Sequence, residues 1–274
     1  MISQIPSVIR ERFINQMITW LLARSCLPII CTFACSTLLP SARAVDPPPD
    51  GGYPNFNTAE GDSALFSLTT GADNTANGYQ ALFSNTSGFS NTAIGIDGLE
   101  GNTTGSLNTA TGGGALEFNT TGNSNTANGF AALASNTTGF FNTATGSVAL
   151  TANSTGFQNT ATGSGALENN LTGSNNTANG VQALFSNTAS YNTAFGGNAM
   201  YSNTTGQGNT STGDEALYSN TTGSANTATG EKQRSISTRP VAKTQVMAWM
   251  PFLVIPAAAT IPPLAQFALL QYHW

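Results

Sequence analysis

Few side chains in this 274-residue chain could do acid–base, nucleophilic or metal chemistry. The single histidine, His273, lies one residue from the end and cannot form a histidine metal cluster or a Ser-His-Asp triad. The three cysteines, Cys26, Cys31 and Cys35, fall within ten residues of one another near the N-terminus. No pattern predicts a catalytic centre, a cofactor or a metal site, so we expect a protein that is not an enzyme.

Acidic residues of the middle section are the remaining candidates for catalysis. They are scattered over several positions of the repeat described below, so they predict neither a continuous ladder nor a catalytic carboxylate pair. The closest pairs in sequence are more typical of solvated surface, and no segment has the GGxGxD pattern of calcium-binding β-rolls. These residues are Glu60, Asp62, Asp73, Asp97, Glu100, Glu117, Glu168, Asp214 and Glu215.

Basic residues are confined to the two ends of the chain. Only 8% of residues are charged, against roughly 25% in an ordinary globular domain. No lysine or arginine lies between Val45 and Glu231. Because nucleic-acid binding needs basic side chains to replace counterions on phosphate, this middle section cannot be a nucleic-acid interface. The eight basic residues are Arg10, Arg12, Arg24, Arg43, Lys232, Arg234, Arg239 and Lys243.

Residues 1–44 have the features of a secretory signal peptide. The apolar run at residues 25–39 is short for a membrane span and ends at an A-x-A cleavage pattern, residues 42–44. The segment before Arg24 is long for a signal peptide, so either Met1 or Met17 could be the initiator. Cleavage would remove all three cysteines and leave a Pro/Gly-rich lead at residues 45–56. These features predict a secreted or cell-surface protein; an uncleaved membrane anchor is the alternative.

One motif, NTAxGxxALxxNTTGxx, recurs eleven times between residues 57 and 232. We number its positions 1–17 from the first asparagine. Successive copies are 17 residues apart, except that the copy beginning at Asn176 has 16 and has lost a residue from its NTTG turn. The copies begin at Asn57, Asn74, Asn91, Asn108, Asn125, Asn142, Asn159, Asn176, Asn192, Asn209 and Asn226.

This repeat predicts an all-β fold, a parallel β-solenoid (β-roll) of about eleven coils. Seventeen residues are too few for two helices and a turn, and Gly, Asn and Thr are poor helix formers. Each copy has little to bury alone, so the copies must stack. We expect two short strands and two Gly/Asn turns per coil, a coil spacing of about 4.8 Å and a rod of roughly 50 Å.

The repeat positions predict which side chains face the interior. The asparagines can stack as ladders and can adopt left-handed turn conformations, and the glycines supply corners. Strand alternation points the alanine and glycine of NTAxG inward, Ala76 and Gly78 in the second copy, and the variable position 4 outward. Position 9 is the predicted core: Leu65, Leu82, Leu99, Leu116, Leu133, Leu150, Leu167, Leu184, Met200 and Leu217.

Position 10 is often aromatic and predicts a possible contact stripe along the rod. Either these rings only cover the edge of each coil, or they mediate lateral association of several rods. We favour association, and hence a homo-oligomer, because a coil of alanine, glycine and one leucine has little core of its own. The residues are Phe66, Phe83, Phe185, Tyr201 and Tyr218.

Threonines in the NTAxG motif support a rival function. Positions 2 and 4 form Thr-x-Thr or Thr-x-Asn in most copies, and if they face outward they make a regular array of hydroxyl and methyl groups. Such an array resembles that of ice-binding solenoids, so an ice-binding or surface-coating protein is one alternative. Glu60, Ile94 and Phe195 interrupt the array. Threonine is also favoured in strands for propensity alone.

The repeat, over residues 57–232, resembles the NTAxGxxAL…NTTG repeats of tail-fibre-type surface proteins of bacteria and phages. It is more distantly similar to the head repeats of trimeric autotransporter adhesins. The resemblance implies a trimeric β-roll fibre, displayed outside the cell, that attaches to a surface ligand not identified by the sequence. We therefore expect a non-enzymatic adhesive fibre that makes multivalent contacts. A passive spacer with no binding site is a further alternative.

Residues 233–274 form an apolar tail that does not continue the repeat. Met247–Leu270 resembles a membrane span in composition but contains four prolines. New codons, each built from the third base of one codon and the first two of the next, force glycine at 247 and alanine at 250, both in phase with the repeat. The same frame permits A-L-Y-x-N-T-T-G over residues 233–240. We therefore interpret the tail as frameshifted, with a genuine hydrophobic anchor as the alternative.

Overall fold

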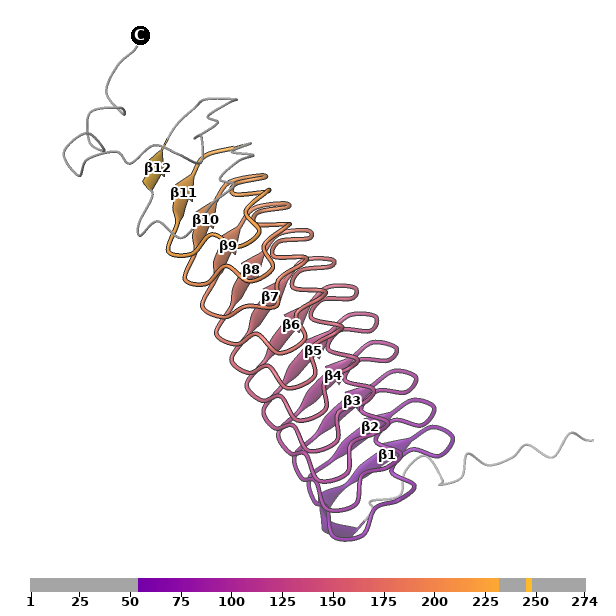
Figure 1. The fold of residues 1–274 in the computed structure, drawn as a ribbon. Coiled ribbons are helices and arrows are strands. Elements are labelled where there is room, and N and C mark those ends of the chain that lie inside the picture. Colours follow the sequence, from indigo (N-terminus) through magenta and orange to yellow (C-terminus); the bar gives the residue numbers. More distant parts are fainter. Residues whose placement is uncertain (1–53, 232–244, 248–274) are drawn as a thin grey trace, which may run out of the picture. The chain divides into compact units, whose positions relative to one another are not determined.

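The computed structural model describes residues 54–231 and 245–247, which form a single stack of coils (Figure 1). A 3-10 turn, η1 (Pro54–Phe56), precedes the first coil. Each coil contributes one strand of three residues: β1 (Thr58–Glu60), β2 (Thr75–Asn77), β3 (Thr92–Ile94), β4 (Thr109–Thr111), β5 (Thr126–Asn128), β6 (Thr143–Thr145), β7 (Thr160–Thr162), β8 (Thr177–Asn179), β9 (Thr193–Phe195), β10 (Thr210–Thr212), β11 (Thr227–Thr229) and β12 (Gln245–Met247).

The twelve strands form one parallel sheet in strict sequence order. Identical repeat positions pair throughout the eleven copies, for example Thr58 with Thr75 and Ala59 with Ala76. The copy of 16 residues keeps the register, since Thr177 pairs with Thr193. The predicted fold class, an all-β parallel solenoid with one coil per copy, is confirmed.

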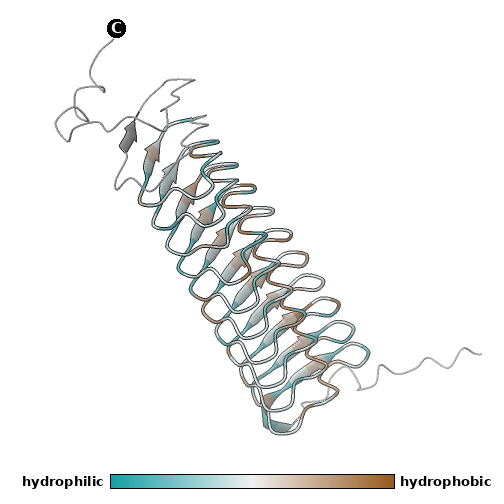
Figure 2. Ribbon diagram, in the orientation of Figure 1, coloured by the Kyte–Doolittle hydropathy of each residue, from teal (hydrophilic) through white to brown (hydrophobic). Residues whose placement is uncertain are grey.

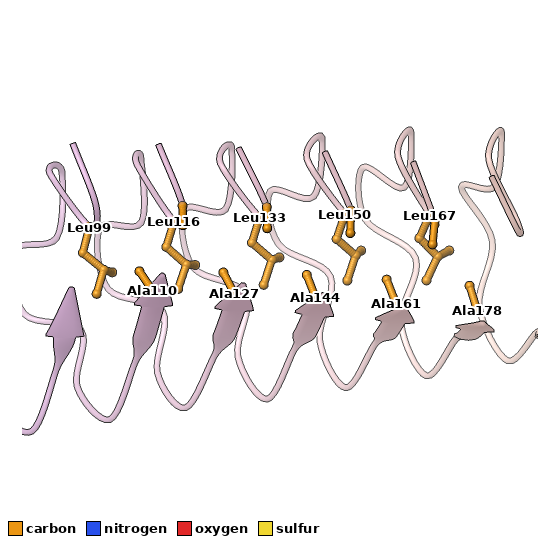
Figure 3. Packing of buried hydrophobic residues seen from close by; sticks show 14 of the residues in the cluster. Leu99, Ala110, Leu116, Ala127, Leu133, Ala144, Leu150, Ala161, Leu167 and Ala178 are labelled. Carbon is orange, nitrogen blue, oxygen red and sulfur yellow. The ribbon is translucent and has the colours of Figure 1, made fainter. Parts of the chain in front are cut away.

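The interior of the rod lies between the strand and the leucine-bearing turn of each coil. The middle residue of every strand from β1 to β11 is buried and its two neighbours are at least partly exposed, as strand alternation requires. Leucines of position 9 approach these alanines from the opposite side (Figure 3). Leu116 and Ala127, for example, have no exposed surface. Figure 2 shows hydrophilic and hydrophobic stretches recurring from coil to coil, which reflects this repeated pattern.

The second strand expected in each coil is absent from the described coils. Positions 7 and 9 take left-handed backbone conformations, as in Gln80 (φ 53°) and Leu82 (φ 54°), and these break the extended geometry. The turn still hydrogen-bonds along the stack, because the Leu82 amide donates to the carbonyl of Gly98 at 2.9 Å. Non-glycine residues rarely adopt this conformation, which costs of order 1–3 kcal/mol at each site. The stacked hydrogen bonds and buried leucines offset that cost.

Two ladders of buried asparagine side chains run the length of the rod. In the opening ladder, at position 1, the Asn91 amide group donates to Oδ1 of Asn74 at 3.1 Å. In the turn ladder, at position 12, Asn102 donates to Oδ1 of Asn85 at 2.8 Å. The ladders were predicted, but the left-handed conformation predicted for the asparagines is wrong here. The ladder residues keep negative φ, and the leucines take the left-handed conformation instead.

The glycine of NTAxG does not face the core, contrary to expectation. Gly78 lies just beyond the end of β2, is partly exposed and has a φ of 140°. A Cβ atom there would collide with the backbone carbonyl of Gly95 in the next coil. Glycine is required at this corner because the chain turns with positive φ while two backbones stack closely. Ala76, by contrast, is fully buried as predicted.

The second glycine, at position 15, joins the two ladders. The carbonyl of Gly88 accepts hydrogen bonds from the side-chain amides of both Asn74, at 2.9 Å, and Asn85, at 3.1 Å. In the shortened copy Ala189 takes this place and accepts from Asn176 at 2.8 Å and Asn187 at 2.7 Å. The coil therefore tolerates the loss of one turn residue because it keeps this shared acceptor.

Several predictions fall outside the described residues. These include the signal peptide at residues 1–44, most of the lead at residues 45–56, and the frameshifted tail at residues 233–274 apart from the strand β12. In the described ranges, no helix has the length and apolar character needed to cross a membrane.

Candidate functional surfaces

The outer face of the parallel sheet, the threonine face, carries two rows of polar side chains. Position 2 is threonine in all eleven copies, from Thr58 to Thr227. In the sixth coil Thr143 and Thr145 are both exposed on either side of buried Ala144. Since the strands pair in register, each row repeats once per coil along the sheet. Glu60, Asn77, Ile94, Asn128, Asn179 and Phe195 replace threonine in the row at position 4.

The aromatic residues of position 10 form two separate stacks. Phe66 and Phe83 stack with ring centroids 5.2 Å apart. Tyr201 stacks on Phe185 at 4.8 Å and on Tyr218 at 5.1 Å, with nearly parallel ring planes. The stripe is not continuous, because the five intervening coils carry Glu100, Glu117, Ala134, Thr151 and Glu168 at this position. Phe66 is exposed and the other four rings are partly exposed.

The structure also gathers acidic residues that look scattered in the sequence. Eight of the ten acids in residues 54–231 fall at positions 6, 7 and 10, in the turn that carries the leucine: Asp62, Asp97, Glu100, Glu117, Glu168, Asp214, Glu215 and Glu231. Tabulating side chains by repeat position would have revealed this grouping. The threonine face carries a single acid, Glu60, so the two sides of each coil differ in charge.

Glu117 is the one carboxyl of the described coils with a perturbed pKa. Partial burial raises the pKa of Glu117 above its ordinary value, and the charges of Glu100 and Asp97 raise it further. Burial and like charges both disfavour the ionised form of a carboxylic acid. Asp97 has one oxygen, Oδ1, that is buried without a hydrogen-bond partner. The described residues contain no group of three or more His, Cys, Asp or Glu arranged to hold a metal ion.

A third cluster of aromatic side chains was not singled out from the sequence. Phe140 and Phe157, at position 16 of successive coils, stack with centroids 5.0 Å apart. Phe141 contacts Phe140 edge-on at 5.5 Å and is 58% exposed. Only two of the described coils contribute to this cluster, so it is a local feature, unlike the rows of the threonine face.

The described residues define a repeat protein of the parallel β-solenoid class. Comparison of the chain with protein-family models, with curated proteins and with solved structures finds no match in any of the three. The argument for function therefore rests on the surfaces of the rod.

Proposed function

We propose that this chain is a secreted, non-enzymatic surface-fibre protein whose rod presents repeated side chains for multivalent attachment. The observation that carries the proposal is the unbroken row of position-2 threonines, repeated in register by eleven paired strands. Identical weak sites on a stiff support gain avidity because each contact holds the next site close to the surface. The resemblance of the repeat to fibre and adhesin repeats points the same way.

Association of rods into a homo-oligomer, a trimer by the same resemblance, is part of this proposal. The two stacks at position 10, Phe66–Phe83 and Phe185–Tyr201–Tyr218, are the contacts that we assign to it. Light scattering on the purified chain gives the oligomer number. Replacing Tyr201 and Tyr218 by serine should lower that number, whereas replacing exposed Thr155 and Thr172 should not.

Adhesion is tested by shortening the rod without changing any coil. Deleting residues 109–142 removes two whole coils and joins Asn108 to Thr143, which restores the NTA motif. Full-length and shortened chains are coupled to beads, and detachment from cells and mineral surfaces is measured under flow. Loss of sites should speed detachment by about tenfold or more. Equal detachment, or no retention of either chain, would support a passive spacer.

Ice binding is the second candidate, favoured by the exposed Thr-x-Thr pairs on a continuous parallel sheet. Thermal hysteresis of the full chain tests it directly. If ice is the ligand, Thr143→Lys should abolish hysteresis, because it places a charged side chain in the middle of the threonine face. Thr155→Lys, an exposed control in the NTTG turn, should leave hysteresis unchanged. Absence of hysteresis in the unmodified chain rejects this candidate.

A further inference from the structure

The turn ladder ends on a buried acceptor that has no donor. In each rung from Asn85 to Asn203, the side-chain oxygen accepts from the asparagine of the next coil, at 2.7–3.2 Å. Asn220 donates to Asn203 Oδ1 at 2.8 Å and to the Gly223 carbonyl at 3.0 Å. Its own Oδ1 is buried without a partner, although the residue has no exposed surface.

A buried acceptor without a donor costs of order 1–3 kcal/mol, and native structures rarely leave one. The missing group is specific, because the repeat places an amide N–H one coil further on at every earlier rung. We propose that the end of the rod formed by Asn220 and Gly223 is an acceptor surface for a further coil of the same repeat. That coil would lie on the same polypeptide, with its position-12 asparagine donating to Asn220 Oδ1. This proposal is independent of the proposed function.

The strand side of this end is already covered, but in a different register. β12 pairs with β11, and Gln245 lies opposite Thr227, a separation of 18 residues. The preceding pair, Thr210 and Thr227, is 17 apart. The tail therefore supplies a strand without restoring the spacing that the turn ladder needs. A donor in register would fall at residue 237, and the alternate reading frame permits asparagine at that codon.

A second copy of the chain stacked end to end does not fit this surface as well. Its first coil has Leu68 where later coils have the ladder asparagine, so it offers no amide to Asn220. Leu68 instead packs against the hydrophobic core of its own rod. The first coil is thus built to end the turn ladder, whereas the last described rung is built to continue it.

The test extends the full chain by one coil in register. Residues 233–249 are replaced by a copy of residues 216–232, which introduces the change Ser237→Asn together with the rest of the repeat. The matched control has the same replacement but with Ser237→Ala. Hydrogen exchange is followed at the amides of residues 220–226, with thermal unfolding as a second readout.

We expect the asparagine variant to slow exchange at residues 220–226 by at least about tenfold relative to the alanine control, and to unfold at a higher temperature. Equal protection in the two variants would overturn the proposal, because the amide would then not be what the end lacks. An end-to-end dimer of the unmodified chain in light scattering, with residues 220–226 already protected, would overturn it in favour of a second copy.

Discussion

The side-chain amide of Asn119 lies 2.8 Å from Oδ1 of Asn102, the residue at the same position one coil earlier. Asn119 also donates to the carbonyl of Gly122 at 3.1 Å, and its own Oδ1 accepts from Asn136 at 2.7 Å. Every polar atom of this buried side chain is therefore tied to a neighbouring coil or turn. Cohesion along the rod depends on these amides as well as on the leucines, because a buried amide without partners is costly.

Replacing Asn119 by aspartate should destabilise the rod. The Asn119→Asp change removes both donors and puts a buried negative charge beside two acceptors, at a cost of about 3–5 kcal/mol. Asn123→Asp is the matched control, since it adds the same charge at an exposed site of the same coil. The urea midpoint and hydrogen exchange in coils three to five measure the effect. A similar loss in both variants would show that charge alone is responsible.

Ser211 offers a stabilising substitution. It stands where the other described strands of the repeat have alanine, and its Oγ is buried without a hydrogen-bond partner. Ser211→Ala should raise the free energy of unfolding by about 1–3 kcal/mol, the cost of an unsatisfied buried hydroxyl. Ala194→Ser, the reverse change in the preceding coil, should lower it by a similar amount. Urea unfolding of both variants decides the matter, and shifts in the same direction would contradict the explanation.

The glycine of NTAxG should not tolerate a side chain. At Gly146, with φ 133°, an added Cβ would lie 2.7 Å from the carbonyl carbon of Gly163. Gly146→Ala should therefore cost well over 1–3 kcal/mol, the range of the backbone strain alone. Gly113→Ala is the control, because its Cβ would meet nothing closer than 3.8 Å. Thermal unfolding should separate the two variants clearly, and equal melting temperatures would refute this account of the corner.

Glu117 predicts a pH dependence of known sign. Because its pKa is raised in the folded state, the folded chain binds the proton more tightly than the unfolded chain does. Its contribution to stability is therefore largest below the unfolded pKa and is lost as pH rises through the folded one. Glu117→Gln should raise the unfolding midpoint at neutral pH and flatten its dependence on pH in the acidic range.

Glu100→Gln provides the companion measurement for the same site. It removes the larger of the two charge effects on Glu117, so the pH dependence should weaken but persist through the burial effect. Salt should weaken the dependence in the unmodified chain for the same reason. An unchanged pH profile in Glu117→Gln would mean that other groups control it.

The sequence by itself determined the period, the fold class and the inside–outside pattern of the strand. A strict 17-residue repeat of small and polar residues can bury its alanines and leucines only by stacking, and alternation in TAx places alanine inside. The same reasoning predicted the asparagine ladders, because identical residues in register bring identical amides together.

Only the tertiary structure decided how each coil turns and which residues meet across coils. Left-handed φ at Leu82 has no local signature, because leucine disfavours it and only the stacked hydrogen bonds and the core stabilise it. The contact between the charges of Glu100 and Glu117 likewise depends on stacking residues 17 apart in sequence. The unpartnered oxygen of Asn220 follows from the same cause, since the donor that each coil needs comes from the next coil and not from its own sequence.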